Sequence, residues 1–331
     1  MNQKSGRERV LVVALGGTIS MKRDASGGIV PALSGDDLVA TVPGLAEVAD
    51  IIVNSPFQIP GASLSLGQIA DVSRLIADSL AGDFSGAIVV QGTDTIEETA
   101  FLLDCLLDAD KPVVVTGAMR GAEAAGADGP ANLLAAATVA ASGARGTGTM
   151  VVLNDEVHSA RFVRKGHTGL PSTFTSAPYG PIGHVMEGSF VQGMQPLPVS
   201  RISGPHAGDI PPVALLQVGL GDDGRLIEAV ERAGFKGAVV SAMGAGHVSK
   251  DMIVPLETLA RTMPVILSTR VVTGPVFEKT YGFPGSEIDL LGRGLIRGGR
   301  LGPIKARLLL QLLLASGQTD TAEIASAFAA R

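Results

Sequence analysis

The sequence is short of aromatic residues and of cysteine. It has no tryptophan, two tyrosines and one cysteine in 331 residues, so the core must be built from aliphatic side chains and alanine. A single cysteine excludes an intrachain disulfide, which is consistent with a reducing compartment such as the cytoplasm. Cys105 lies in the apolar run FLLDCLLD, where helical spacing favours a core position over a reactive thiol.

Clusters of basic residues and long apolar segments are lacking as well. The formal net charge is −6 and Lys and Arg form no stripe, which argues against nucleic acid as a partner. The apolar stretch at residues 308–315 is too short to span a bilayer, so no membrane association is expected. The basic N-terminus runs straight into a glycine–threonine motif, which predicts no cleaved signal peptide and therefore a cytoplasmic protein.

The histidines give no sign of a metal site. They show neither an HExxH pair nor a cysteine partner, and they are His158, His167, His184, His206 and His247. We therefore expect no metal and no organic cofactor.

Apolar β-runs alternate with helical patterns along the first part of the chain. Strands are predicted at residues 10–14, 51–54, 87–90, 113–116 and 150–154, and helices near 66–80, 96–108 and 130–141. This alternation is typical of a doubly wound parallel sheet with right-handed crossovers. A segment rich in Pro, Gly and Ser follows without any period, which indicates a linker at residues 193–212.

A second α/β pattern follows the linker. It comprises predicted strands at 213–218, 238–242 and 265–268, and helices at 225–233, 256–262, 303–315 and, without a capping box, 319–330. The sequence thus predicts an α/β fold with two doubly wound domains. The larger N-terminal domain, residues 1–192, has a parallel or mixed sheet, and the smaller C-terminal domain, residues 213–331, is Rossmann-like.

Two threonine-bearing loops follow predicted strands of the first domain. LGGTIS contains Thr18, and QGTDTIEETAF contains Thr93 and Asp94. Ligands in open α/β sheets collect outside the carboxyl ends of the strands, so these three residues would share one crevice. The preceding glycines leave backbone N–H groups free to stabilise an oxyanion. Each loop taken singly is equally compatible with an ordinary glycine turn, and neither has nucleotide-binding spacing.

Three later segments complete a specific pattern: VVVTGAMR at 113–120, ADGPANL at 127–133, and the stretch from NDEV to Lys165. With them the chain resembles the bacterial L-asparaginase family, Thr-dependent amidohydrolases that act on asparagine and, in some members, glutamine. Further matches at 179–181, 268–273 and 305–307 extend the resemblance from about residue 10 to about residue 316.

The resemblance implies a catalytic set of Thr18, Thr93, Asp94 and Lys165. Thr18 would be the primary nucleophile and form an acyl-enzyme ester, while Lys165 and Asp94 polarise Thr93. The sequence leaves open which threonine attacks first. Without the resemblance, Lys165 would be interpreted as a charged surface residue. Asp94 would also bind the substrate's α-ammonium group, and backbone groups of Gly92 and Ala118 would line the pocket.

Two departures from the family pattern concern substrate contacts. Family members often carry a tyrosine in the loop after the first motif, whereas residues 21–35 contain none. The interpretation is that Tyr281, from the second domain of a neighbouring subunit, replaces it or that the proton leaves through water. Gly61 stands where the family places a serine for the α-carboxylate, so Ser63 or backbone N–H groups would hold that group.

A third departure concerns the segment that the family contributes across a subunit interface. The stretch at residues 244–247 replaces the family's asparagine-bearing segment. One interpretation is that His247 stands in for the asparagine, although a lone histidine is more often a structural hydrogen-bonder. The accompanying acidic residue is Glu278 or Glu287.

The leading hypothesis is a cytoplasmic L-asparaginase with possible activity on L-glutamine, working as a homodimer or homotetramer. One alternative is a catalytically impaired asparagine-binding or regulatory module, because the loop tyrosine and the serine are missing. Another is the ammonia-generating subunit of a tRNA-dependent amidotransferase, which resembles the same family. A one-methylene difference is worth only about 1–3 kcal/mol in a pocket, so the sequence does not separate asparagine from glutamine.

Overall fold

The computed structural model describes residues 6–17, 21–23, 29–31, 35–202 and 210–331. The chain divides into two compact units, residues 1–201 and 202–331. The division falls inside the segment 193–212 that the sequence indicates as a linker.

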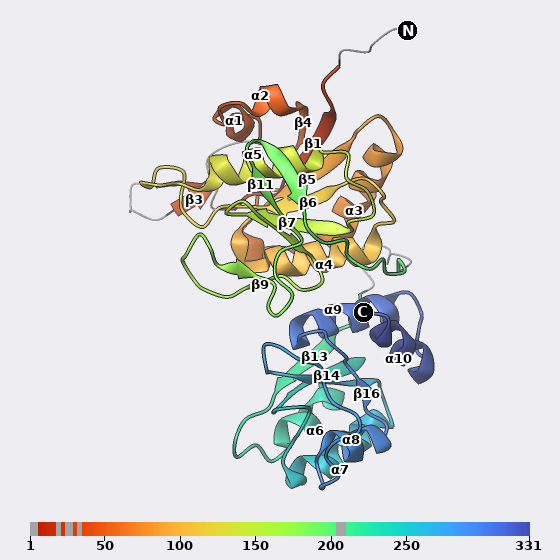
Figure 1. Ribbon diagram of the computed structural model, residues 1–331. Coiled ribbons are helices and arrows are strands. Elements are labelled where there is room, and N and C mark those ends of the chain that lie inside the picture. Colours follow the sequence, from red (N-terminus) through yellow and green to blue (C-terminus); the bar gives the residue numbers. More distant parts are fainter. Residues whose placement is uncertain (1–5, 18–20, 24–28, 32–34, 203–209) are drawn as a thin grey trace. The chain divides into compact units, whose positions relative to one another are not determined.

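An eight-stranded mixed sheet forms the centre of unit 1 (Figure 1), with the order β12-β11-β8-β7-β6-β5-β1-β4. Five strands run parallel: β1 (Arg9–Ala14), β4 (Asp50–Asn54), β5 (Gly86–Val90), β6 (Val113–Thr116) and β7 (Thr149–Leu153). The remaining three form antiparallel pairs: β8 (Glu156–Ser159), β11 (Gly183–Met186) and β12 (Ser189–Gln192). The central strands β5, β6 and β7 are buried throughout, as expected for a sheet covered on both faces.

Helices cover both faces of this sheet (Figure 1). α3 (Leu66–Ala81) and α4 (Ile96–Leu106) pack together on one face, and α5 (Gly129–Ala140) lies on the other with the short α1 (Gly35–Ala40) and α2 (Leu45–Val48). A capping box starts α3: the Ser65 hydroxyl accepts from the backbone N–H of Gln68, whose side chain accepts from the Ser65 N–H. The alanine-rich face of α5 closes the aliphatic core over β1, β5 and β6.

Besides α1, α2 and the antiparallel strands β8, β11 and β12, several shorter elements of unit 1 were not predicted. They are β2 (Met21–Arg23) with β3 (Ile29–Pro31), β9 (Arg164–Lys165) with β10 (Phe174–Thr175), and the 3₁₀ turns η2 (Gly61–Ser63) and η3 (Thr93–Thr95). Strands of two or three residues are too short to show an alternating pattern.

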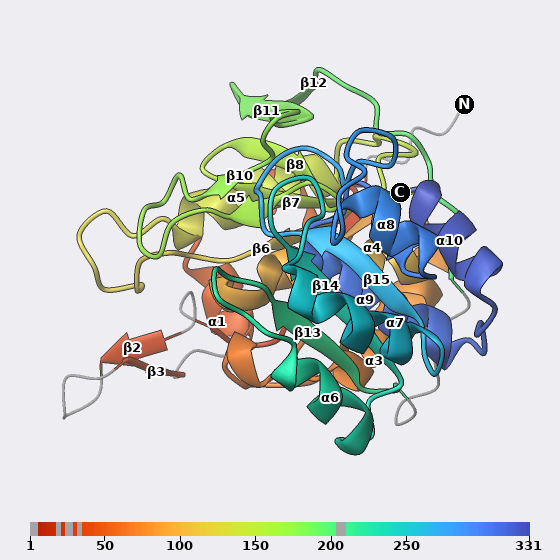
Figure 2. The same cartoon turned by 90° about the horizontal axis from the view of Figure 1, so that it is seen from below.

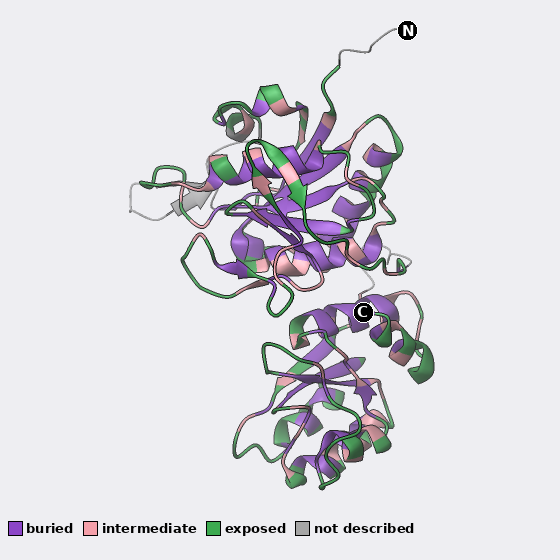
Figure 3. Cartoon of the chain, viewed as in Figure 1, coloured by how far each residue is buried: buried purple, intermediate pink, exposed green. Residues whose placement is uncertain are grey.

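Unit 2 contains a four-stranded, all-parallel sheet (Figure 2), in the order β13 (Val213–Gln217), β14 (Gly237–Ala242), β15 (Val265–Thr269) and β16 (Ile296–Arg297). α9 (Pro303–Ala315) packs on β13, β14 and β15 and is followed by α10 (Thr321–Ala329). α6 (Arg225–Arg232) packs with α7 (Ile253–Ala260), which follows η4 (Lys250–Met252), and α8 (Glu287–Gly292) follows the long loop after β15. The strands of each unit are coloured mostly as buried in Figure 3, which marks a separate aliphatic core in each.

The fold class is therefore confirmed: α/β, with a large mixed sheet in the first unit and a small parallel sheet in the second. Two helix starts were wrong. α7 begins at Ile253 rather than at residue 256, and α10 begins after Asp320, whose carboxylate accepts from the N–H groups of Ala322 and Glu323. No helix within the described ranges is long and apolar enough to cross a membrane.

Candidate active site

Three loops meet at the carboxyl ends of adjacent strands in unit 1. Gly17 follows β1, Gly92 follows β5 and Gly117 follows β6. A Cβ atom on Gly17 would lie 2.1 Å from the backbone nitrogen of Gly92, and one on Gly117 would lie 2.4 Å from the carbonyl oxygen of Gln91. Only glycine permits such close backbone approach. Thr18, the predicted nucleophile, lies outside the described residues.

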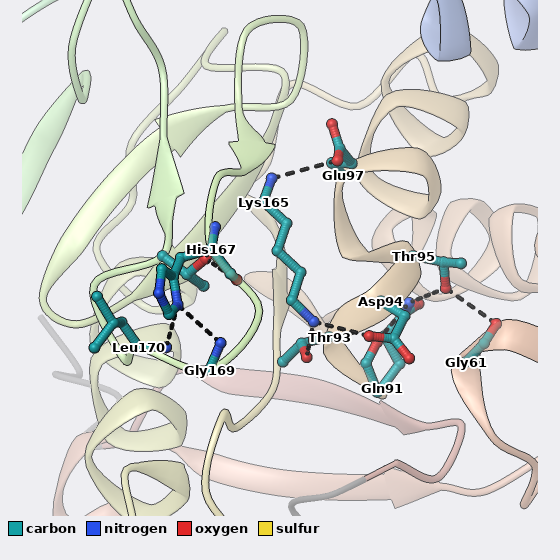
Figure 4. Close-up of polar contacts among 12 residues, drawn as sticks. Gly61, Gln91, Thr93, Asp94, Thr95, Glu97, Lys165, His167, Gly169 and Leu170 are labelled. Carbon is teal, nitrogen blue, oxygen red and sulfur yellow. Dashed lines mark hydrogen bonds and ion pairs between the residues drawn. The ribbon is translucent and has the colours of Figure 1, made fainter.

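The ammonium group of Lys165 links the two polar residues of the second threonine loop (Figure 4). Its Nζ lies 2.9 Å from Thr93 Oγ1 and 2.8 Å from Asp94 Oδ1. The Thr93 side chain is buried, the Lys165 side chain is 16% exposed and the Asp94 side chain is 72% exposed. Three of the four predicted catalytic residues are thus brought together, and a cation on a hydroxyl oxygen stabilises its deprotonated form.

Lys165 reaches this position from the short β9–β10 hairpin. Its backbone N–H donates to Glu97 Oε1 at 3.3 Å, and Glu97 stands in the first turn of α4, directly after the threonine loop. Sequence analysis missed this role of Glu97, because acidic residues at a helix N-terminus are common for electrostatic reasons alone.

A chain of hydrogen bonds connects the threonine loop to η2. The side-chain amide of Gln91 donates to Thr95 Oγ1 at 3.0 Å, and the Thr95 hydroxyl donates to the carbonyl oxygen of Gly61 at 3.1 Å. A Cβ atom on Gly61 would lie 3.0 Å from the carbonyl oxygen of Gly92. The missing serine at position 61 therefore corresponds to a tight contact, in which a side chain fits only if these loops separate slightly. Ser63, at the end of η2, is exposed.

The loop after β6 is fixed by the ADGPANL segment. The amide of Asn132 donates to the carbonyl oxygen of Gly117 at 2.9 Å. The carboxylate of Asp128 accepts from the N–H groups of Met119 and Arg120 at 3.0 and 2.8 Å. Buried Ala118 lies between these anchored residues. The segment thus has a positioning role, which sequence matching alone did not assign.

The predicted residues of unit 2 form a separate cluster. His247 Nε2 lies 3.2 Å from Glu287 Oε2, and the rings of His247 and Tyr281 meet edge to face with centroids 4.9 Å apart. Glu287 is fully buried, whereas Tyr281 is 41% exposed. Glu278, the other acidic candidate, is half-exposed and lies 3.8 Å from Arg297.

Glu287 is held as a carboxylate despite its burial. Burial alone raises the pKa of Glu287, but hydrogen bonds from the Tyr281 and Thr280 N–H groups and from His247 bring this pKa below its ordinary value. The charged carboxylate therefore fixes the loop that carries Tyr281 and the ring of His247 together.

These features define a class of protein: a doubly wound α/β enzyme with a threonine, lysine and aspartate cluster at the carboxyl ends of its parallel strands. Within the described part of the chain, no group of three or more His, Cys, Asp or Glu side chains is placed to hold a metal ion. Such a site can activate a hydroxyl group for attack on a carbonyl carbon.

Comparison with known protein families identifies the family to which the chain belongs. Residues 9–196 match "Asparaginase, N-terminal" and residues 212–328 match "Glutaminase/Asparaginase C-terminal domain". The chain belongs to the asparaginase family, as the sequence resemblance implied, and is accordingly a hydrolase.

Named relatives cover nearly the full chain. An L-asparaginase of Bacillus licheniformis is 33% identical over 316 residues, which span 93% of this chain and 96% of the relative. L-asparaginase 2 of Escherichia coli K12 is 32% identical over 314 residues, spanning 92% and 88%. The crystal structure of a probable cytoplasmic L-asparaginase from Campylobacter jejuni matches with a TM-score of 0.87 at 31% identity, covering 98% of this chain and all of that chain.

Proposed function

We propose that this protein is an L-asparaginase that releases aspartate and ammonia through a threonine acyl-enzyme. The observation that carries the proposal is the Lys165 ammonium group shared between Thr93 Oγ1 and Asp94 Oδ1, in a chain similar to L-asparaginases along nearly its whole length.

The proposed reaction proceeds in two steps. In the first, the Thr18 hydroxyl attacks the side-chain amide carbon of asparagine, and the oxyanion faces backbone N–H groups near Thr93 and Ala118. The C–N bond then breaks and ammonia leaves with the proton that Thr18 gives up. In the second step water, polarised by Thr93 with Lys165, attacks the ester and frees aspartate and the Thr18 hydroxyl. No metal or organic cofactor takes part in this proposal.

Substrate binding is assigned to the surrounding groups. The side chain of Asp94 is 72% exposed and is proposed to receive the substrate's α-ammonium group. Because Gly61 carries no side chain, the α-carboxylate is assigned to backbone N–H groups of η2 and to Ser63. Hydrolysis of glutamine is proposed as a side activity, since one methylene changes binding by only about 1–3 kcal/mol.

The proposed assembly is a homodimer or homotetramer in which unit 2 of one subunit completes the site of another. His247, Tyr281 and Glu287 are the residues proposed to act across that interface. The Tyr281 ring is exposed and its backbone N–H is held by Glu287, which supports Tyr281 as the replacement for a tyrosine in the loop after Thr18.

Subunit mixing tests this assembly. Thr93→Ala and Glu287→Gln proteins, each of low activity, are unfolded, combined in equal amounts and refolded. If sites are shared across a dimer, half of the dimers are mixed and each has one intact site, so about a quarter of the wild-type activity returns. Recovery of no activity contradicts sharing. Retention of full activity by Tyr281→Phe contradicts the role of its hydroxyl.

The compartment is proposed to be the cytoplasm. The single, buried cysteine and the similarity to a protein described as a probable cytoplasmic L-asparaginase support this assignment. A relative from Haemophilus influenzae is named as a probable periplasmic L-asparaginase, so cell fractionation is the appropriate test.

The first experiment measures ammonia release from L-asparagine and L-glutamine by purified protein. Thr18→Ala, Thr93→Ala and Lys165→Met are expected to lower kcat by at least about a hundredfold. Thr258→Ala, at an exposed threonine of α7 in unit 2, serves as the matched control and keeps wild-type activity. Asparagine binding without turnover in the wild-type protein would instead identify a binding or regulatory module. The amidotransferase alternative predicts activity only with a second protein present.

A further inference from the structure

His167 lies two residues beyond Lys165 and closes the turn of the β9–β10 hairpin, which carries Lys165 (Figure 4). Its Nδ1 atom lies 3.0 Å from the backbone nitrogen of Gly169 and 3.1 Å from that of Leu170. A backbone N–H group only donates, so Nδ1 must accept both hydrogen bonds. The imidazole ring is therefore neutral in this arrangement and carries its proton on Nε2.

The same turn is closed from its other side by Thr173. The Gly166 N–H donates to the Thr173 carbonyl oxygen at 2.8 Å, and the His167 N–H donates to Thr173 Oγ1 at 2.6 Å. The Thr173 hydroxyl in turn donates to the His167 carbonyl oxygen. Residues 166–173 thus form one hydrogen-bonded turn with His167 at its centre.

Apart from its turn, the hairpin is held by the buried side chain of Phe174 and by the hydrogen bond from the Lys165 N–H to Glu97. β9 and β10 contain two residues each and pair only with each other, through Lys165 with Phe174 and Arg164 with Thr175. A two-stranded ladder this short is marginally stable in water, so the contacts of the turn add to these anchors in holding the hairpin. The position of the Lys165 ammonium group on Thr93 and Asp94 depends on that hairpin.

We propose that His167 is a positioning residue whose neutral imidazole keeps Lys165 on Thr93 and Asp94, and that protonation of the ring releases the turn. This inference rests on the proposed function, because it assumes that Lys165 serves the reaction. A protonated Nδ1 is a donor, so it no longer accepts from Gly169 and Leu170, and both N–H groups lose their partner.

The charged groups near the turn are not placed to bind the protonated His167 ring in exchange for the hydrogen bonds that it loses. Lys165 and Arg164 lie on the same strand, and Asp94 and Glu97 face Lys165 from the threonine loop and from α4. β10 contributes uncharged residues. Across the ranges that the structure describes, no carboxylate oxygen lies within 4.0 Å of either ring nitrogen of His167.

Replacing His167 by asparagine keeps a hydrogen-bond acceptor in the turn but removes the group that can be protonated. Asparagine Oδ1 branches from Cγ as His Nδ1 does, and asparagine commonly accepts from N–H groups two and three residues ahead in turns. His167→Asn therefore keeps the turn closed at every pH. His167→Ala removes the acceptor altogether. His184→Asn, at an exposed histidine of β11, is the matched control.

The kinetic test is the pH dependence of kcat for ammonia release from L-asparagine. Histidine side chains titrate between about pH 5 and 8, and wild-type kcat is expected to fall towards the acid end of that range. His167→Asn should lose most of this fall and His184→Asn should keep it. The kcat of His167→Ala should be roughly fivefold to tenfold below that of wild type at pH 8 and should converge with it towards the acid end. An unchanged acid limb in His167→Asn, or wild-type kcat in His167→Ala at pH 8, overturns the proposal.

Hydrogen exchange provides a readout that does not need turnover. Exchange of peptides covering residues 165–175 is compared between wild type, His167→Asn and His184→Asn at the same pH, after division by the intrinsic rates of each sequence. Wild type is expected to exchange several-fold faster than His167→Asn at pH 5.5 and equally at pH 8. Equal exchange at both pH values overturns the inference even if asparagine is hydrolysed. The expected difference in a protein that hydrolyses no amide leaves the turn mechanism standing and refutes the proposed function.

Discussion

Gly17→Ala is expected to remove most of the activity while leaving the fold in place. Gly17 has a φ of 98°, and a Cβ atom there would lie 2.1 Å from the backbone nitrogen of Gly92 and 2.5 Å from its Cα. These are backbone atoms, so no side-chain rotation relieves the overlap. The loop after β5 must retreat by about 1.3 Å to restore ordinary van der Waals contact.

That retreat acts directly on the proposed catalytic groups, because Thr93 is bonded to Gly92. A displacement of about 1 Å in a catalytic group costs roughly a hundredfold in rate. The alanine also adds about 1–2 kcal/mol of strain in the left-handed region. We therefore expect kcat/KM for asparagine to fall about a hundredfold, with a modest loss of thermal stability.

A variant at a second glycine separates displacement of the loop from backbone strain. Gly143, just after α5, has a φ of 72° and no atom within 4 Å of the position of its Cβ. Gly143→Ala therefore carries the same backbone strain without displacing a loop. Thermal unfolding should shift to lower temperature in both variants, whereas ammonia release should fall only in Gly17→Ala. Wild-type kcat/KM in Gly17→Ala would show that the contact between the two loops does not position Thr93.

Three further predictions concern single interactions. Glu97→Ala removes the acceptor for the Lys165 N–H and should lower kcat about fivefold. Glu97→Gln keeps an oxygen at this position and should have wild-type kcat. Equal kcat in both variants contradicts a positioning role of Glu97. Burial lowers the pKa of His158 in spite of nearby Glu156. The imidazole therefore binds a proton more readily in the unfolded chain than in the folded one. The contribution of the neutral His158 ring to stability is complete above about pH 6.5 and is lost as the pH falls. In thermal unfolding, His158→Asn should lose less stability between pH 7 and pH 5 than wild type, and an identical loss argues against the assignment. Asp320→Ala removes the cap of α10 and should lower the free energy of unfolding by about 1 kcal/mol, measured with urea; an unchanged midpoint would show that the cap adds nothing.

The parts of the fold that could be predicted are those with long periodic patterns. The buried runs of β1, β5, β6 and β7 contain continuous aliphatic residues, which is the pattern of a parallel strand covered on both faces. α3 and α9 extend for 16 and 13 residues, long enough for a helical pattern to be recognised. Glycine–threonine strings then located the loops at the correct ends of these strands.

The antiparallel edge of the first sheet could not be predicted in the same way. β8, β11 and β12 have four residues each, and β11 and β12 are largely exposed. A four-residue strand at a sheet edge has neither a continuous apolar run nor enough alternation to distinguish it from a loop. The start of α10 was missed for a simpler reason: only a capping box was sought, whereas Asp320 caps the helix by itself.

In the candidate site, the sequence identifies residue types but not the contacts between distant segments. Lys165 lies 72 residues from Thr93, on a strand of two residues, so only family resemblance marked it as part of the site. Gln91, Thr95 and Glu97 hold their neighbours through hydrogen bonds that have no characteristic spacing. Such positioning residues become visible only when the tertiary contacts are known.

Glu278 and Glu287 illustrate the same limit, and the structure shows how differently the two carboxylates are surrounded. Both are acidic residues in the region after β15, and nothing in the local sequence separates them. A carboxylate can be buried only when its lost hydration is replaced by hydrogen bonds. Glu287 meets this condition, because two backbone N–H groups and His247 surround it, whereas Glu278 remains half-exposed beside Arg297. Because Glu287 is fully occupied by these partners, its contribution to a neighbouring active site is expected to come through the ring and loop that it holds in place.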